Sequence, residues 1–279
     1  MQKDNASKSS AKANKSKNTA KPVYKPYLRG TIVSGLAAKR SLHIMLLIAL
    51  LAFFGALISG VLSFENTALR FIMNAFIVAM GASLLYNNGA RQGENDVAFG
   101  EIALKHQNEG TEVTAKEKDA CYHPCKGFFT ALVGVAPFLL IAIVYALIAE
   151  KQTYTLGVLP NWVQSYETWD DIGPALAYYQ ETASATLGDW LRVIVRLMLF
   201  PFMNMFGGSD YSKLYVLDRI SPLLTLILPT FYGLGYLRGP YLRALVHGNI
   251  RLARRRQNRD QRKAREQRAK KTPQKKELI

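Results

Sequence analysis

Four apolar blocks, none with a charge in its middle, constrain the fold of this chain more than any other feature. They cover residues 42–63, 68–86, 128–149 and 220–237, so each is 18 to 22 residues long. A helix needs about 20 apolar residues to cross a hydrocarbon core about 30 Å thick. A soluble domain of this size would instead show shorter apolar runs with amphipathic periodicity. The blocks therefore predict an all-α integral membrane protein with about four transmembrane helices.

Basic residues are concentrated at the two ends of the chain. Residues 1–40 hold ten Lys and Arg against one acid, and residues 238–279 hold fifteen against three. The N-terminal stretch is a low-complexity mixture of Lys, Ala, Asn and Ser without a periodic apolar face, which predicts disorder. Lys and Arg beside membrane spans favour the cytoplasmic side. We therefore expect disordered basic tails, and a multi-pass protein of the plasma membrane with both termini in the cytoplasm.

The blocks and tails divide the chain into segments. NNG at 87–89 is a typical helix-stop signal, so the first two blocks are expected to form a transmembrane hairpin. A mixed-charge loop with a short helix near 95–106 follows it. The expected order is a cytosolic tail (1–40), the hairpin (41–87), a cytosolic loop (88–126), a third span (127–149), an extracytoplasmic segment (150–218), a fourth span (219–238) and a basic cytosolic tail (239–279).

Residues 188–206, GDWLRVIVRLMLFPFMNMF, resemble a further span at first sight. A central Arg costs about 2.5–3.5 kcal/mol in a membrane, and each Leu, Ile, Val or Phe returns about 0.3–0.6 kcal/mol. The nine such residues of 191–206 return roughly 3–5 kcal/mol, against up to roughly 5–7 for the two arginines. Arg192 and Arg196 lie one helical turn apart and share a face. The pattern favours an interfacial amphipathic helix over 189–206, with both arginines toward lipid headgroups.

The basic tails argue independently for the same threading. If 188–206 spanned the membrane there would be five spans, and the most basic segment of the chain would be exported. An interfacial 188–206 keeps both tails in the cytoplasm and places the acidic, aromatic segment 150–218 outside. The loop 88–126 opposes this threading, because it would be cytosolic and yet holds five Lys and Arg against seven acids.

The C-terminal tail is the strongest candidate for a binding segment. Residues 251–271, RLARRRQNRDQRKAREQRAKK, contain eleven Arg and Lys, no aromatic residue to stack on bases and no apolar stripe. Three roles remain open: binding of anionic lipid headgroups, binding of RNA (including ribosomal RNA), or a topology anchor without a partner. The candidate contact residues are Arg251, Arg254, Arg255, Arg256, Arg259, Arg262, Lys263, Arg265 and Arg268.

Other motifs carry less chemistry. Cys121, His123 and Cys125 in DACYHPCKG offer thiolates and an imidazole for zinc or copper, but they form one half-site where structural zinc usually has four ligands. A turn at Pro124 with incidental thiols explains the same residues. YGLGYLRGP at 232–240 resembles a dinucleotide fingerprint, but its last glycine is one residue late and no strand precedes it. We interpret Gly235 and Gly239 as close helix contacts, and we expect no cofactor.

Function is constrained mainly by what the spans lack. Ion pathways and intramembrane catalysts usually have ionisable residues at depth, and the apolar blocks hold few. We therefore expect a non-enzymatic scaffold, accessory or translocation-associated subunit whose tails contact anionic lipid or RNA. The alternative is a small transporter subunit that completes a pathway with partner membrane chains. A membrane enzyme that uses the Cys/His loop is a third hypothesis, and no small-molecule substrate can be named.

Overall fold

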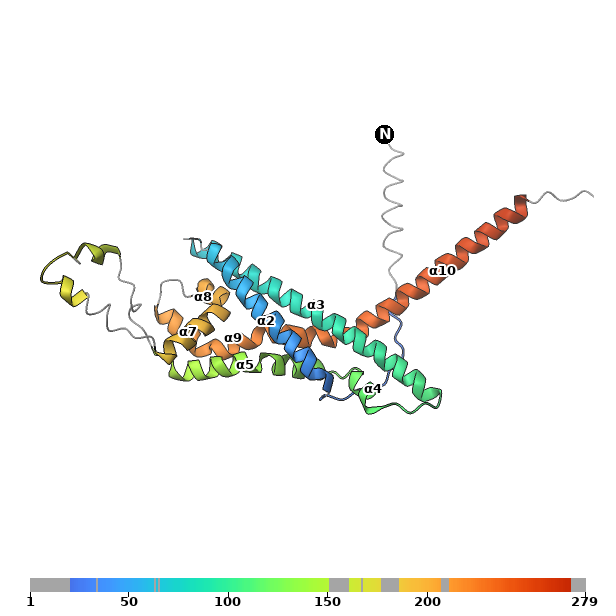
Figure 1. Cartoon of the computed structure of the whole chain (residues 1–279). Coiled ribbons are helices and arrows are strands. Elements are labelled where there is room, and N and C mark those ends of the chain that lie inside the picture. Colours follow the sequence, from blue (N-terminus) through green and yellow to red (C-terminus); the bar gives the residue numbers. More distant parts are fainter. Residues whose placement is uncertain are drawn as a thin grey trace, which may run out of the picture. The chain divides into compact units, whose positions relative to one another are not determined.

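The computed structural model describes residues 21–33, 35–62, 64, 66–150, 161–166, 168–176, 186–206 and 211–271. Within these ranges it contains nine helices and no strand (Figure 1). Four of the helices are long and apolar enough to cross a membrane, which confirms the predicted fold class. The chain divides into two compact units: unit 1 comprises 1–30, 92–122 and 238–279, and unit 2 comprises 31–91 and 123–237.

The four long apolar helices of the described chain are α2 (Gly35–Val61), α3 (Thr67–Asn108), α5 (Lys126–Ile148) and α9 (Tyr211–Leu237). α5 begins and ends within one residue of the predicted third span and continues through Pro137. α9 begins eight residues before the predicted fourth span, because the polar residues of its first turns are helical as well. α9 is therefore one continuous helix whose first turns are polar and whose remainder is the apolar block.

The expected end of the second span at NNG is wrong, because α3 continues through these residues to Asn108. Gly89 is buried where α9 approaches, and a Cβ atom there would lie 2.1 Å from the carbonyl oxygen of Tyr232. Gly89 therefore allows α3 and α9 to approach closely and does not end the helix. The helix ends only before Gly110, whose φ of +81° is the left-handed conformation common after helix C-termini. The expected loop 88–126 is thus largely helical.

Glycines set the helix spacing within unit 2. Phe128 of α5 lies over Gly233 of α9, and Tyr236 of α9 lies over Gly127 of α5, so each helix inserts a ring into the other. Small residues at such positions let membrane helices approach closely. Ile44, Ile48, Leu85, Ala131, Val135 and Tyr232 from α2, α3, α5 and α9 form the buried core around these contacts.

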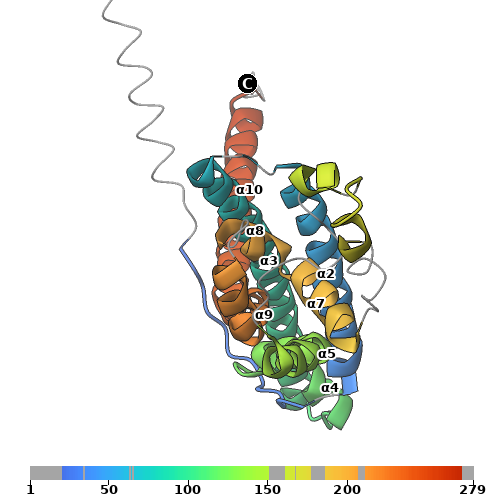
Figure 2. The same cartoon turned by 90° about the vertical axis from the view of Figure 1, so that its left-hand side faces the viewer.

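The segment 188–206 forms two short helices, α7 (Leu187–Met198) and α8 (Phe200–Phe206). At about 1.5 Å per residue, α7 is about 18 Å long and too short to span a membrane. Both helices pack on α2, and α7 also packs on α5, as Figure 2 shows. Their apolar side chains enter a second buried core, made of Tyr145, Ala149, Val195, Leu199, Phe202, Met203 and Leu217.

Unit 1 combines three parts of the chain that are far apart in sequence. Residues 21–30 are extended, α3 contributes 92–108, α4 covers Ala115–Ala120, and α10 covers Gly239–Lys271. The predicted disorder of the C-terminal tail is wrong as far as Lys271. Arg, Lys, Gln and Ala are all strong helix formers, and the first turns of α10 are docked on α3. The predicted disorder of residues 1–20 lies outside the described residues.

Candidate functional site

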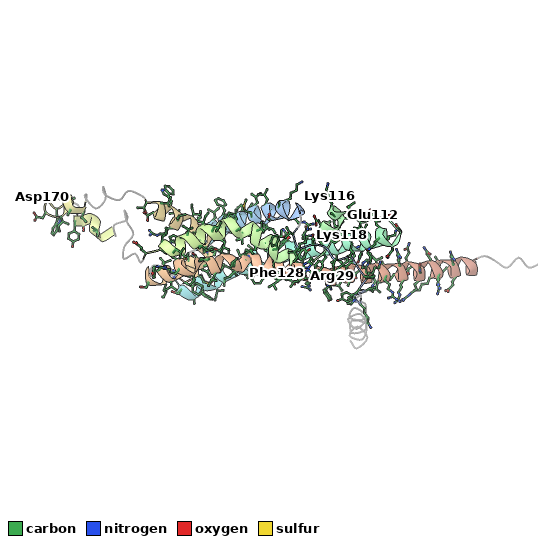
Figure 3. All side chains as sticks on the ribbon, turned by 90° about the horizontal axis from the view of Figure 1, so that it is seen from below. Arg29, Glu112, Lys116, Lys118, Phe128 and Asp170 are labelled. Carbon is green, nitrogen blue, oxygen red and sulfur yellow. The ribbon has the colours of Figure 1, made fainter. Side chains whose placement is uncertain are left out.

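The basic part of α10 presents its charges to solvent. Every side chain from Ala253 to Gln267 is exposed. Side chains project from opposite sides of α10 in Figure 3. The predicted contact residues that the structure places on this exposed stretch are Arg254, Arg255, Arg256, Arg259, Arg262, Lys263 and Arg265; Arg251 is exposed just before it, and the side chain of Arg268 is not described.

The distribution of charge around α10 bears on its partner. A helix that lies on a bilayer needs an apolar face to bury and a charged face opposite. Successive residues rotate by about 100° on a helix, so Arg254, Arg255 and Arg256 alone point in three widely separated directions. Their uniform exposure gives this stretch no apolar face. A helix that is polar all round has no stripe to bury against an apolar surface.

An ion-pair network holds α10 within unit 1. Glu101 on α3 accepts hydrogen bonds from Arg243 Nε (3.1 Å) and Nη2 (3.0 Å), and its other oxygen lies 2.7 Å from His247 Nε2. The three side chains are largely buried. Arg243 and His247 are one turn apart, so a single carboxylate joins two successive turns of α10. Glu101 therefore fixes the base of the helix that carries the exposed charges.

Gly239 and Gly235 also take part in helix contacts, as the sequence predicted. A Cβ at Gly239 would lie 2.3 Å from the backbone of Gly93, within unit 1. A Cβ at Gly235 would lie 2.0 Å from the carbonyl oxygen of Tyr86, within unit 2. No side chain larger than hydrogen fits at either position without displacement of backbone.

The predicted interfacial arginines have protein partners. Arg192 Nη1 lies 2.7 Å from Asp189 Oδ1, three residues earlier on α7. Arg196 donates from Nε to Asp218 Oδ1 (3.1 Å) and from Nη2 to Asp218 Oδ2 (2.7 Å) on α9. The expectation that both guanidinium groups face headgroups is therefore corrected for Arg196. Its charge is neutralised by Asp218, which lies one residue before the predicted fourth span (219–238).

The hydrogen bonds of Arg196 and Asp189 shift the pKa values of both groups. Burial alone lowers the pKa of Arg196, but the hydrogen bonds and charge of Asp218 outweigh it, so the pKa is raised and the guanidinium stays charged. Thr186 caps α7 by accepting from the backbone N–H of Asp189 with its side-chain oxygen. Its hydroxyl and backbone N–H donate to the Asp189 carboxylate, and these bonds lower the pKa of Asp189. The cap therefore stabilises α7 at neutral pH and is lost as the pH falls through that lowered value.

Asp218 was missed by sequence reasoning because DRIS at 218–221 lies at the edge of the last apolar block. Its side chain is 1 % exposed. Ser221 donates to the carbonyl oxygen of Asp218 (2.7 Å), and Thr225 donates to that of Ser221 (2.9 Å). Because Arg196 satisfies both carboxylate oxygens, the pair accounts for the docking of α7 on α9 without a transported ion.

A second buried polar network joins α2, α3 and α8. Ser59 donates from Oγ to Asn74 Oδ1, and Asn74 donates from Nδ2 to the carbonyl oxygen of Arg70 (2.7 Å). Asn204 of α8 donates to the carbonyl and hydroxyl oxygens of Ser59, both at 3.1 Å. Asn74 therefore joins α3 to α2, and Ser59 extends the contact to α8.

The Cys/His motif is not arranged as a metal centre. Cys121 is buried and donates from its thiol to the carbonyl oxygen of Glu117 (3.1 Å), whereas Cys125 is exposed. The backbone N–H of Cys125 donates to His123 Nδ1 at 3.3 Å, which is a local turn contact. Across the described residues, no three His, Cys, Asp or Glu side chains are grouped so that they could hold a metal ion.

Comparison of the chain with protein-family models, with curated proteins and with solved structures finds no match. The geometry therefore carries the functional argument alone. Beyond apolar packing, the described residues offer two kinds of feature: a long exposed basic helix that is held at its base, and buried polar contacts that fasten helices to one another. Only the first of them is open to a partner.

Proposed function

We propose that the protein is a non-enzymatic membrane scaffold, accessory or translocation-associated, that presents α10 to RNA at the cytoplasmic face. The exposed basic surface of α10, without an apolar face, is the observation that carries this proposal. RNA phosphates attract such a surface in a sequence-independent way, and arginine-rich helices are a common means of binding folded RNA. Ribosomal RNA is one candidate partner, because arginine-rich segments neutralise its phosphates.

The contacts inside unit 1 support a location of both tails on one membrane side. Val23 N–H donates to Ala244 O (2.9 Å), which joins the N-terminal segment to α10. Leu28 N–H donates to Gly100 O (3.0 Å), which joins it to α3. These bonds support the proposal that residues 21–30, 92–122 and 238–271 share a side. Two candidate spans lie between the first and second of these segments, and two between the second and third, as that arrangement requires.

A labelling experiment tests this threading. We expect a single cysteine at Thr272, in a Cys121→Ser, Cys125→Ser background, to react with an impermeant thiol reagent only after cells are opened. A cysteine at Asp170 in the same background is the matched control and should react in intact cells. Labelling of Thr272→Cys in intact cells would place α10 outside and remove RNA in the cytoplasm as its partner.

RNA binding is tested with the full chain in nanodiscs of neutral phosphatidylcholine. We expect a labelled structured RNA to bind, with an affinity that falls roughly 100-fold between 50 and 200 mM salt, since about four to five phosphates are neutralised. A variant in which Arg254, Arg255, Arg256, Arg259 and Arg262 are changed to Gln should lose most of this binding and most of the salt dependence.

The control variant removes the same charge from the other tail, by changing Lys3, Lys8, Lys12, Lys15 and Lys17 to Gln. It should keep most of the RNA affinity, because the proposed binding surface is α10 and these five lysines lie outside it. Equal losses in the two variants would show that net charge alone attracts RNA. Binding to phosphatidylglycerol vesicles without binding to RNA would assign α10 to lipid.

A further inference from the structure

A notch in unit 1 lies between the extended N-terminal segment and α10. Its lining residues are Lys21 and Val23 from the segment, and Gly248, Arg251, Leu252 and Arg255 from α10, around a volume of about 280 Å³. The hydrogen bond from Val23 N–H to Ala244 O holds the segment against the helix. Three of the six lining residues are cationic and none is acidic.

The arrangement of the arginines makes the notch suited to an anion. Arg251 and Arg255 are four residues apart, so they lie on one face of α10 with a rise of about 6 Å between them. Like charges at this spacing destabilise a helix, and a bound anion removes that repulsion. Guanidinium groups also match phosphate geometry, because they donate two parallel hydrogen bonds to adjacent oxygens.

The remaining lining residues give the notch an apolar floor. Gly248 is buried and has no side chain, and Val23 and Leu252 are half-buried beside it. Lys21 and Val23 both line the notch, whereas Tyr24 is exposed and is not among its lining residues. In such a notch the oxygens of a sugar phosphate would contact the cationic side chains. The C–H groups of the sugar would contact Val23, Gly248 and Leu252.

We propose that this notch seats one backbone phosphate of RNA, as a specific subsite that the N-terminal segment and α10 build together. The inference rests on the proposed RNA-binding function and adds to it a fixed point of attachment. The exposed charges farther along α10 then contact phosphates by general attraction. The notch makes Lys21, which is 230 residues before Arg251 in the sequence, part of the binding surface.

Charge-matched variants of the full chain in phosphatidylcholine nanodiscs separate the notch from general attraction. Arg251→Gln with Arg255→Gln removes two charges inside it, and Arg259→Gln with Lys263→Gln removes two charges at the same spacing outside it. We expect the first pair to weaken binding of the labelled RNA about tenfold more than the second. Lys21→Gln should likewise weaken it several-fold more than Lys25→Gln, and should add little once Arg251 and Arg255 are changed.

Val23→Pro provides a test without a change of charge. It removes the N–H that binds Ala244 O, so the segment should leave the helix and RNA affinity should fall as far as in Lys21→Gln. Equal losses for the Arg251/Arg255 and Arg259/Lys263 variants, or no effect of Val23→Pro, would overturn the notch while RNA binding by α10 stands. No RNA binding by the unaltered chain would overturn the proposed function itself. Loss of phosphatidylglycerol-vesicle binding in the notch variants, with RNA affinity unchanged, would make the notch a lipid-headgroup site instead.

Discussion

Asp218→Asn is expected to destabilise the protein by about 3 kcal/mol, because the guanidinium of Arg196, whose side chain is 27 % exposed, loses its counter-charge. Arg196 donates to both oxygens of Asp218, at 3.1 and 2.7 Å, and the carboxylate is 1 % exposed. The pair joins α7 to α9 at the core formed around Tyr145 and Leu217. Its loss should release α7 before the long helices separate.

Thermal unfolding of the purified protein in neutral detergent, followed by tryptophan fluorescence, measures this effect. Trp190 lies on α7 and is one of the three tryptophans that contribute to this signal. Arg192→Gln is the matched control, because its partner Asp189 lies in the same helix and is partly exposed, so we expect a cost below about 1 kcal/mol. The double variant Arg196→Met, Asp218→Leu should restore stability, since replacing a buried pair with apolar side chains is often neutral. A large loss in the double variant would show that the charges do more than hold α7.

Gly235→Ala is expected to destabilise the contact between α3 and α9 by about 1–3 kcal/mol. The added Cβ would lie 2.0 Å from the carbonyl oxygen of Tyr86, and backbone must move to admit it. In an open helical position the same change stabilises by roughly 0.5–1 kcal/mol. The sign of the effect therefore distinguishes a packed glycine from a free one.

Gly60→Ala is the matched control in α2, because its Cβ would meet nothing closer than Phe200 at 4.0 Å. We expect it to be neutral or slightly stabilising in the same unfolding assay. Gly89→Ala, whose Cβ would lie 2.1 Å from the carbonyl oxygen of Tyr232, should behave like Gly235→Ala. If both packed glycines tolerate alanine without loss, the close approach of α3 and α9 is not required for stability.

The apolar blocks were predictable because they depend on local properties, whereas the partners of Gly235 and Gly239 lie far away in the sequence. A run of about 20 apolar residues has few alternatives to a membrane helix, whatever surrounds it. The end of α3 was not predictable in this way, since NNG has the composition of a stop. Only the approach of Tyr232 explains why Gly89 stays helical.

In the candidate site, too, some features depend on local sequence and others on contacts between distant residues. The basic residues of 251–271 identified a candidate binding segment, but the tail was expected to be disordered where the structure has a helix. Its attachment depends on Glu101, which is more than a hundred residues earlier and belongs to a segment expected to be a loop. No periodicity within the tail could show that a carboxylate elsewhere binds two of its turns.

The sequence by itself determined that this is an all-α membrane protein with four apolar helices, basic ends and a marginal fifth segment. These properties follow from hydropathy and charge, which are summed along the chain. The tertiary structure alone decided the partner of Arg196 and the length of α3. It alone also showed that Lys21, Arg251 and Arg255 line one notch. Each depends on a contact between residues far apart in the chain, and the energy of such a contact appears only when both partners are in place.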